Sequence, residues 1–163
     1  MKELVIGFLI ALCLGAIWND MSSKQQPLGV DQGAMQPGLV GQELIAEVDQ
    51  GMFQGYVLDS KDPVLVEFYT DTCSICKTMA PVLGKLAIQG QSAIRMCKIN
   101  AQNNQSLAET YNVRGVPTFV LFKDGHMQDS TAGGMDEEEM RAWLANYDVN
   151  IPRGSANPGS PEG

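Results

Sequence analysis

The chain has 163 residues, of which 44% are apolar and 18% charged, which leaves room for one domain with an ordinary hydrophobic core. Eleven Lys and Arg against 19 Asp and Glu give a net charge of −8, spread along the chain, which argues against a nucleic-acid-binding surface and a polybasic lipid-binding patch. Four cysteines are too few for a domain held together mainly by disulfides, so each cysteine needs its own explanation.

The N-terminus carries an apolar run without a charge, residues 4–18, with the sequence LVIGFLIALCLGAIW. As a helix its 15 residues would rise about 22 Å, short of the roughly 30 Å hydrocarbon core unless the bilayer thins locally. We predict that residues 1–18 are a membrane anchor, and a cleaved signal peptide is the main alternative. A lipoprotein signal at Cys13 and a buried helix are further alternatives. Anchor and signal peptide both place the following domain on the extracytoplasmic side, tethered or secreted.

Two segments lack apolar periodicity and frame the rest of the chain. Residues 19–41 contain two Pro, four Gly and four Gln, a composition typical of a flexible linker. Residues 149–163, VNIPRGSANPGSPEG, are predicted to be a disordered tail. The folded domain is therefore expected at residues 42–148.

The first half of this domain alternates strand and helix patterns. A short strand is predicted at residues 44–48, followed by a helical stretch around residues 52–58. Residues 64–69, VLVEFY, are almost continuously apolar, as in a strand covered on both faces. A long helix is predicted from Cys73 to about Gln89.

The second half continues the alternation and then changes to a hairpin. A strand is predicted at residues 94–99 and a short helix at residues 104–111. Residues 118–122 and 127–131 are predicted to form a β-hairpin, joined through Lys123-Asp124-Gly125. A helix with an acidic first turn is expected at residues 136–146. This order predicts an α/β domain whose mixed sheet has helices on both faces.

Cys73 and Cys76 form a CxxC motif where a predicted strand leads into a predicted helix. The free N–H groups and the dipole at a helix N-terminus stabilise a thiolate, so we expect a lowered pKa for Cys73. Cys76 would lie one turn further on, close enough to attack a mixed disulfide formed by Cys73. The motif therefore predicts dithiol–disulfide exchange, with Cys73 attacking and Cys76 resolving.

A CxxC pair is also half of a zinc site, which makes metal binding an alternative. The other possible ligands are Cys97, the single histidine His126, and Cys13, and none of them is paired at ligand spacing. We therefore predict no metal site. Cys97 lies in a predicted strand, where we expect a buried core thiol, with a regulatory role as the alternative.

Longer stretches around the CxxC motif resemble the thioredoxin family. They are VLVEFYTDTCSICKTMAPVL, CKINAQNN, YNVRGVPTFVLFKDG and AGG, in the family's order and spacing, within residues 42–148. The resemblance implies a thioredoxin fold, with a central mixed sheet, four flanking helices and an active-site disulfide between Cys73 and Cys76. It implies no cofactor besides that disulfide. Here the fold would be preceded by the hydrophobic N-terminal helix.

Two charged residues match functional positions of the family. Glu67 stands six residues before Cys73, where thioredoxins have a buried Asp and protein disulfide isomerases a Glu. A buried carboxylate there would have a raised pKa and could take the proton of Cys76 through a water molecule. Lys98 matches the family lysine that approaches this carboxylate. We expect both to assist catalysis, and a purely structural role is the alternative for each.

Further matches and departures concern the substrate-binding surface. Val116-Pro117 matches the family's cis-proline loop, which faces the cysteines and offers backbone groups to an extended substrate. Gly133 matches the glycine that borders the substrate groove. The family's Trp before the first cysteine is Thr72 here, and the usual Gly-Pro or Gly-His between the cysteines is Ser74-Ile75. These departures change the docking surface and suggest a dedicated protein partner.

The sequence therefore predicts a membrane-tethered or exported thiol–disulfide oxidoreductase acting on protein disulfides or thiols. A reducing direction is favoured, because no histidine separates the cysteines. Such an enzyme would need electrons from an unidentified membrane redox partner. Its membrane contact would run through residues 4–18, and no nucleic-acid partner is expected. The alternative is a thioredoxin-fold binding module of an envelope assembly, whose CxxC pair is structural or regulatory.

Overall fold

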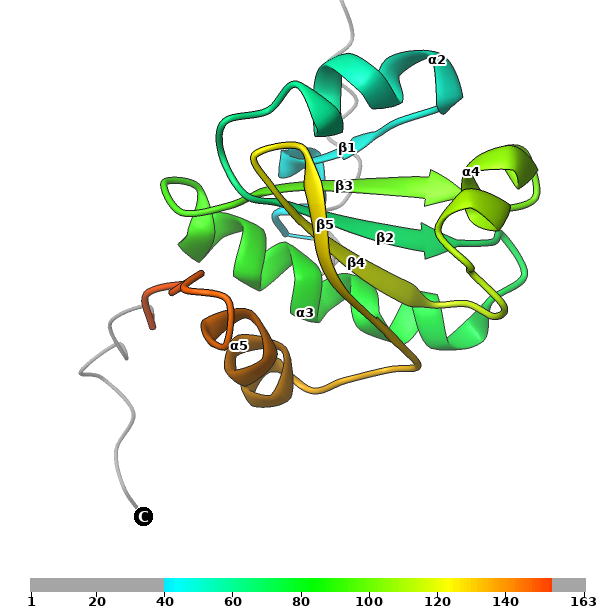
Figure 1. Cartoon of the computed structure of the whole chain (residues 1–163). Helices are drawn as coiled ribbons and strands as arrows, with labels where there is room; N and C mark the ends of the chain where they lie inside the picture. The colour runs from blue at the N-terminus through cyan, green and yellow to red at the C-terminus, as the bar shows by residue number, and fades with distance from the viewer. Residues whose placement is uncertain (1–39, 154–163) are drawn as a thin grey trace, which may run out of the picture. The chain divides into compact units, whose positions relative to one another are not determined.

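The computed structural model describes residues 40–153 (Figure 1). The predicted hydrophobic helix, almost all of the predicted linker, and residues 154–163 lie outside these described residues. In chain order, the elements are η1 (Gln42–Leu44), β1 (Ile45–Glu47), α2 (Gln50–Phe53), η2 (Gln54–Leu58), β2 (Val64–Tyr69), α3 (Ser74–Gly90), β3 (Arg95–Asn100), α4 (Gln105–Thr110), β4 (Thr118–Lys123), β5 (His126–Ala132) and α5 (Glu137–Ala145).

The five strands form one mixed sheet in the order β1-β3-β2-β4-β5. β3 runs parallel to both β1 and β2, whereas β4 is antiparallel to β2 and to β5. The predicted mixed sheet is thus confirmed, and β2 has the predicted bounds. The other elements differ from their predicted ends by one or two residues, because end residues are set by hydrogen bonds that a local pattern does not specify.

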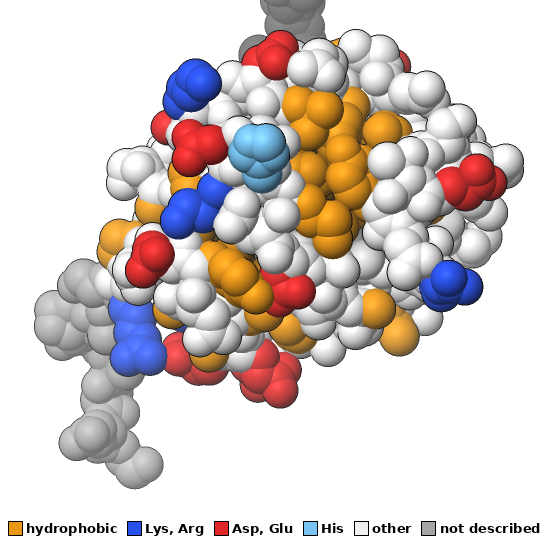
Figure 2. Space-filling view, in the orientation of Figure 1, with side chains coloured by type: hydrophobic (Ala, Val, Ile, Leu, Met, Phe, Trp, Pro, Cys, Tyr) orange, Lys and Arg blue, Asp and Glu red, His pale blue; other side chains and the backbone are white. Residues whose placement is uncertain are grey.

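Alternating side chains of the strands supply two hydrophobic cores, one on each face of the sheet. Leu65 of β2 packs with α3 and α5, while Val64, Val66 and Phe68 pack on the opposite face with α2 and α4. Figure 2 looks onto the molecule in the orientation of Figure 1 and shows apolar side chains gathered at the surface on the side of α2 and α4. Because α3 and α5 pack on one face and α2 and α4 on the other, helices lie on both faces of the sheet, as predicted.

Local signals explain how two of the later elements begin and end. The hairpin turns at Asp124 and Gly125, whose φ values of 51° and 76° suit a two-residue turn that follows the twist of the strands. α5 begins with a capping box, in which the Asp136 side chain accepts a hydrogen bond from the Glu139 N–H at 2.8 Å. Acidic residues of the predicted first turn therefore cap and stabilise the N-terminus of α5.

The start of the domain is held against the middle of α3. Gly41 has a φ of 88°, and a Cβ at either Gly41 or Gly84 would collide with a backbone carbonyl of the opposite segment. The Gln42 side-chain amide also donates a hydrogen bond to the Ala80 carbonyl. Two glycines thus allow a contact between backbones that any larger residue would prevent.

The folded part continues beyond residue 148, where the disordered tail was expected to begin. Val149 and Ile151 are buried in the core beside α3 and α5. The Arg141 guanidinium donates a hydrogen bond to the Ile151 carbonyl at 2.8 Å, and Arg153 pairs with Glu138 at 2.7 Å. The prediction that the disordered tail begins at residue 149 is wrong, because the side chains of Val149 and Ile151 belong to the core.

Within residues 40–153, no helix combines the length and the apolar character needed to cross a bilayer.

Replacing Gly84 by Ala tests the backbone contact at α3. In an open helical position this change stabilises a protein by about 1 kcal/mol, but here the new methyl group meets the Val40 carbonyl. We expect the free energy of unfolding to fall by about 1–3 kcal/mol, measured by urea denaturation. Gly55→Ala is the control, because nothing lies within 4 Å of its Cβ position, and it should be neutral or stabilising. Equal effects of both variants would contradict the contact.

Candidate active site

Cys73 and Cys76 lie at the N-terminus of α3 and are joined in a disulfide, with their Cα atoms 5.3 Å apart. β2 ends at Tyr69, and a short turn, closed by a hydrogen bond from the Cys73 N–H to the Thr70 carbonyl at 3.1 Å, leads into the helix. Cys73 is the N-cap residue, and its sulfur accepts a hydrogen bond from the Cys76 N–H at 3.1 Å. The predicted placement of Cys73 at the helix N-terminus is confirmed.

The two cysteines differ in their exposure to solvent. Cys73 is half-buried, whereas Cys76 is buried with 7% of its surface exposed. An incoming protein disulfide therefore meets Cys73 first, and Cys76 lies behind it. This asymmetry is what the roles of attacking and resolving cysteine require.

The residues that differ from the common family motif form the exposed rim of the site. Thr72, Ser74 and Ile75 are all exposed, and 48% of the Ile75 surface is accessible although the side chain is apolar. A protein substrate would contact these side chains before it reached the sulfurs. Their role in substrate binding stays a prediction.

The Val116-Pro117 peptide bond is cis, as the sequence resemblance implied. It immediately precedes β4, whose Thr118 pairs with Phe68 near the end of β2. The loop therefore lies at the end of the sheet where β2 ends and the chain continues to the cysteines. The Pro117 carbonyl accepts a hydrogen bond from the Gly133 N–H at 2.9 Å, which connects the two predicted substrate-binding positions.

Gly134 approaches the CxxC turn more closely than Gly133 does. A Cβ at Gly134 would lie 3.0 Å from Ile75 Cγ2, whereas a Cβ at Gly133 would meet nothing within 4 Å. Gly133 instead has a φ of 100°, which favours glycine for a conformational reason. Sequence reasoning singled out Gly133 and missed Gly134, although the second glycine of the Gly-Gly pair was visible.

Glu67 is buried on β2, on the sheet face that α3 covers. Only 7% of its surface is exposed, and its Oε1 atom has no hydrogen-bond partner among the described residues. Burial raises the pKa of this carboxyl from 4.5 to about 7, and the positive charge of Lys98 acts in the opposite direction. The predicted burial is confirmed and the direction of the pKa agrees with the prediction, whereas the catalytic role of Glu67 stays a prediction.

A cavity of about 240 Å³ has both Glu67 and Cys76 on its wall. A cavity of this size with several polar side chains on its wall accommodates water molecules, which can relay a proton between groups that do not touch. The remaining wall residues are Gln42, Tyr69, Thr70, Asp71, Lys77, Ala80 and Lys98.

Lys98 stands beside Glu67 in the register of β2 and β3 but forms its ion pair elsewhere. Its Nζ lies 3.8 Å from Glu47 Oε2 and 5.2 Å from the centre of the Tyr69 ring. Lys98 was predicted to approach the buried carboxylate. In the described residues it forms no ion pair with Glu67, and only its positive charge acts on the Glu67 pKa, which it lowers. Glu47 was not singled out from the sequence, because only the strand register brings it to this place.

Cys97 lies on the opposite face of the sheet from the disulfide and is free. It is buried, with 1% of its surface exposed, and burial raises the pKa of its thiol to about 12. A thiol with such a pKa is almost fully protonated at neutral pH and therefore unreactive. The predicted burial of Cys97 is confirmed.

Residues 40–153 contain no group of three or more His, Cys, Asp or Glu side chains arranged to hold a metal ion. The zinc alternative therefore finds no ligand set in this part of the chain.

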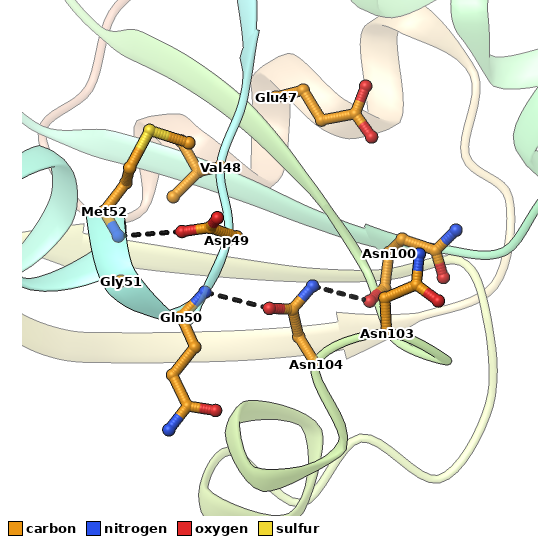
Figure 3. A pocket seen from close by; sticks show the side chains of 9 residues that line it. All are labelled: Glu47, Val48, Asp49, Gln50, Gly51, Met52, Asn100, Asn103 and Asn104. Atoms are coloured by element: carbon orange, nitrogen blue, oxygen red, sulfur yellow. Dashed lines mark hydrogen bonds between the residues drawn. The ribbon is translucent and has the colours of Figure 1, made fainter.

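A second cavity, of about 530 Å³, lies away from the cysteines, between the turns that follow β1 and β3 (Figure 3). Its polar groups bond largely to one another. The Asn104 side chain accepts a hydrogen bond from the Gln50 N–H at 2.8 Å and donates one to the Asn100 carbonyl at 3.0 Å, and Asp49 caps α2. These bonds join the two turns, so their first role is structural.

Comparison with known proteins gives the same identification for the domain. The family model described as Thioredoxin matches residues 44–146. A thioredoxin from Pseudomonas aeruginosa is 38% identical over 109 residues, which cover 67% of this chain and 98% of that protein. Thioredoxin 1 from Synechococcus elongatus is 37% identical over 102 residues, which cover 63% of this chain and 95% of that protein. These similarities favour the enzyme over a binding module with a structural disulfide.

Replacing Glu67 by Gln tests the raised pKa through protein stability. Because the native carboxyl has a pKa of about 7 and the unfolded one 4.5, the native state binds more protons between these pH values. The contribution of Glu67 to the free energy of unfolding is therefore fully present below pH 4.5. It decreases by about 3 kcal/mol as the pH rises through 7.

The measurement is urea denaturation of the oxidised protein between pH 4 and pH 8. Glu67→Gln should raise the free energy of unfolding at pH 8 by up to about 3 kcal/mol and have little effect near pH 4. Glu109→Gln, which neutralises an exposed carboxylate on α4, is the control and should show no such trend. A difference that does not grow with pH would refute the raised pKa.

Proposed function

Because the chain belongs to the thioredoxin family and is a thiol–disulfide oxidoreductase with a Cys73–Cys76 pair, we propose that it reduces disulfides of exported proteins while tethered to a membrane. Proteins that carry disulfides are the substrates of such an enzyme. The observation that carries the proposal is the half-buried Cys73 at the N-terminus of α3, with buried Cys76 behind it.

The first step forms a mixed disulfide. The Cys73 thiolate, stabilised by the Cys76 N–H and the N-terminus of α3, attacks one sulfur of the substrate disulfide. A bond forms between Cys73 and that sulfur, and the other substrate sulfur leaves as a thiolate. The extended substrate segment docks over exposed Thr72, Ser74 and Ile75.

The second step releases the substrate. The Cys76 thiol loses its proton to the Glu67 carboxylate through water in the cavity that they share. The Cys76 thiolate then attacks the Cys73 sulfur, which forms the Cys73–Cys76 disulfide and frees the second substrate thiolate. The substrate disulfide gains two electrons, and the cysteine pair loses two.

The reducing direction is proposed because Ser74 and Ile75 provide no positive charge between the cysteines. A cation there would stabilise the reduced dithiol state and make the enzyme a stronger oxidant. The disulfide formed in each cycle must be reduced again, and we propose a membrane redox partner as the electron donor. No cofactor besides the cysteine pair enters this cycle.

The membrane attachment is proposed from the sequence of residues 1–41. The uncharged apolar run at residues 4–18 would anchor the chain, and the Pro, Gly and Gln of residues 19–41 would act as the linker. The domain would then work on the extracytoplasmic side. Secretion after signal cleavage is the competing outcome.

Replacing Cys76 by Ser tests the exchange mechanism. The variant keeps the attacking thiol but lacks the resolving one, so mixed disulfides with protein substrates should accumulate and run as reducible high-mass bands on non-reducing gels. The trapped proteins, identified by mass spectrometry, would define the substrates.

The control is Cys73→Ser/Cys76→Ser, compared with Cys76→Ser in a Cys13→Ser background, and it should trap nothing because the remaining cysteine, Cys97, is buried. An equal set of bands from this control would contradict attack by Cys73. Wild-type protein should give few bands, since Cys76 resolves them.

Fractionation tests the proposed attachment. The full chain should stay in the membrane pellet after an alkaline carbonate wash, whereas a chain that begins at residue 19 behind a cleavable export signal should be released. The intact mass of the expressed full chain distinguishes an uncleaved anchor from a cleaved signal peptide, because cleavage would leave a shortened, soluble protein.

A further inference from the structure

Three charged residues form one row across three neighbouring strands. Glu47, the last residue of β1, pairs in register with Lys98 of β3, which in turn pairs with Glu67 of β2. All three lie on the sheet face that α3 covers, because they alternate with the residues of the opposite core. Lys98 therefore stands between two carboxylates, of which Glu47 is exposed and Glu67 is buried.

Lys98 forms its ion pair with Glu47, the exposed carboxylate of the row. Its Nζ is 3.8 Å from Glu47 Oε2, while no ion pair within 4 Å joins it to Glu67 in the described residues. The Tyr69 hydroxyl donates a hydrogen bond to Glu47 Oε1 at 2.7 Å, and the Lys98 ammonium stands 5.2 Å from the centre of the Tyr69 ring. Lys98 thus contacts the exposed Glu47 and the Tyr69 ring, and not Glu67.

We propose that Glu47 is a positioning residue, which keeps the Lys98 charge partly neutralised and turned away from Glu67 and so sets the pH at which Glu67 can accept the Cys76 proton. This inference rests on the proposed role of Glu67 in the second step of exchange. It also accounts for Glu67 Oε1, which has no hydrogen-bond partner among the described residues although a lysine stands beside it in the register.

The other groups around Glu67 do not take the place of the Lys98 charge in setting its pKa. α3 contributes Cys76 and Lys77 to the cavity, and β2 with its following turn contributes Tyr69 and Asp71. From β4, the register partner of Glu67 is the apolar Phe119. Lys98 is the group whose charge acts on the pKa of Glu67, so its partner controls that influence.

Neutralising Glu47 should make the Glu67 carboxylate easier to ionise. In Glu47→Gln the amide oxygen can still accept the Tyr69 hydrogen bond, but the charge that opposes Lys98 is lost. The uncompensated Lys98 charge then favours the ionised form of Glu67, so the pKa of Glu67 should fall by roughly half a unit to one unit. Since a weaker base accepts protons less readily, the plateau rate at high pH should fall as well.

Two readouts on the full chain test this. The pKa of Glu67 is measured from its side-chain carboxyl ¹³C shift, and the rate of mixed-disulfide resolution is followed against pH by stopped flow. Both midpoints should move to lower pH in Glu47→Gln, and neither should move in the control Glu109→Gln, which removes the same charge from α4. Unchanged midpoints in Glu47→Gln would overturn the inference.

A double-mutant cycle tests whether the effect runs through Lys98. In a Lys98→Gln background, Glu47→Gln should shift the pKa of Glu67 much less than it does in the wild type. Additive shifts would overturn the positioning role, because Glu47 would then act on Glu67 directly.

Glu67→Gln separates this inference from the proposed function. The variant should lose the pH-dependent step in resolution. If the step remains, Glu67 is not the proton acceptor and the proposed function is wrong at that point. The carboxyl shift of Glu67 in Glu47→Gln still reports on positioning in that case, so the two failures are distinguishable.

Discussion

The constraint on which the proposed chemistry depends is a carboxylate buried in the middle of the sheet. Glu67 lies on β2, beneath the first turns of α3 and on the same cavity as Cys76. Burial of an ionisable group lowers the stability of the charged form, and here the pKa rises to about 7. In the proposed cycle, a group that exchanges its proton near neutral pH thus lies on the same cavity as a thiol that loses one.

The rest of the fold holds the reacting groups in position. β2 supplies Glu67 and leads directly into the turn that carries Cys73, so the proposed base and the attacking cysteine belong to one continuous segment. α3 presents Cys73 at its N-terminus, and the contact between Gly41 and Gly84 fixes the start of the domain against that helix. The antiparallel β4 brings the cis Val116-Pro117 bond to the same edge of the sheet.

The chemistry is that of the family, but its adjustment belongs to this chain. The exposed Ile75 and Thr72 give the rim a surface that differs from the common motif, and a substrate must fit it. Behind the rim, Glu47 and the Tyr69 ring contact Lys98, the cation among the described residues whose charge lowers the pKa of Glu67. In the proposed cycle, substrate choice and proton transfer are thus governed by separate groups of residues, one exposed and one beneath the cysteines.

The sequence alone determined the features that depend on neighbouring residues. The apolar run of β2, the CxxC pair at the start of α3 and the Asp124-Gly125 turn each form through local backbone and side-chain preferences, and the resemblance to thioredoxins added Glu67 and Pro117. Only the tertiary structure decided the Glu47–Lys98–Glu67 row, the approach of Gly134 to Ile75 and the burial of Val149 and Ile151. These contacts join residues far apart in the chain, and they arise from strand register and close packing, which no local pattern specifies.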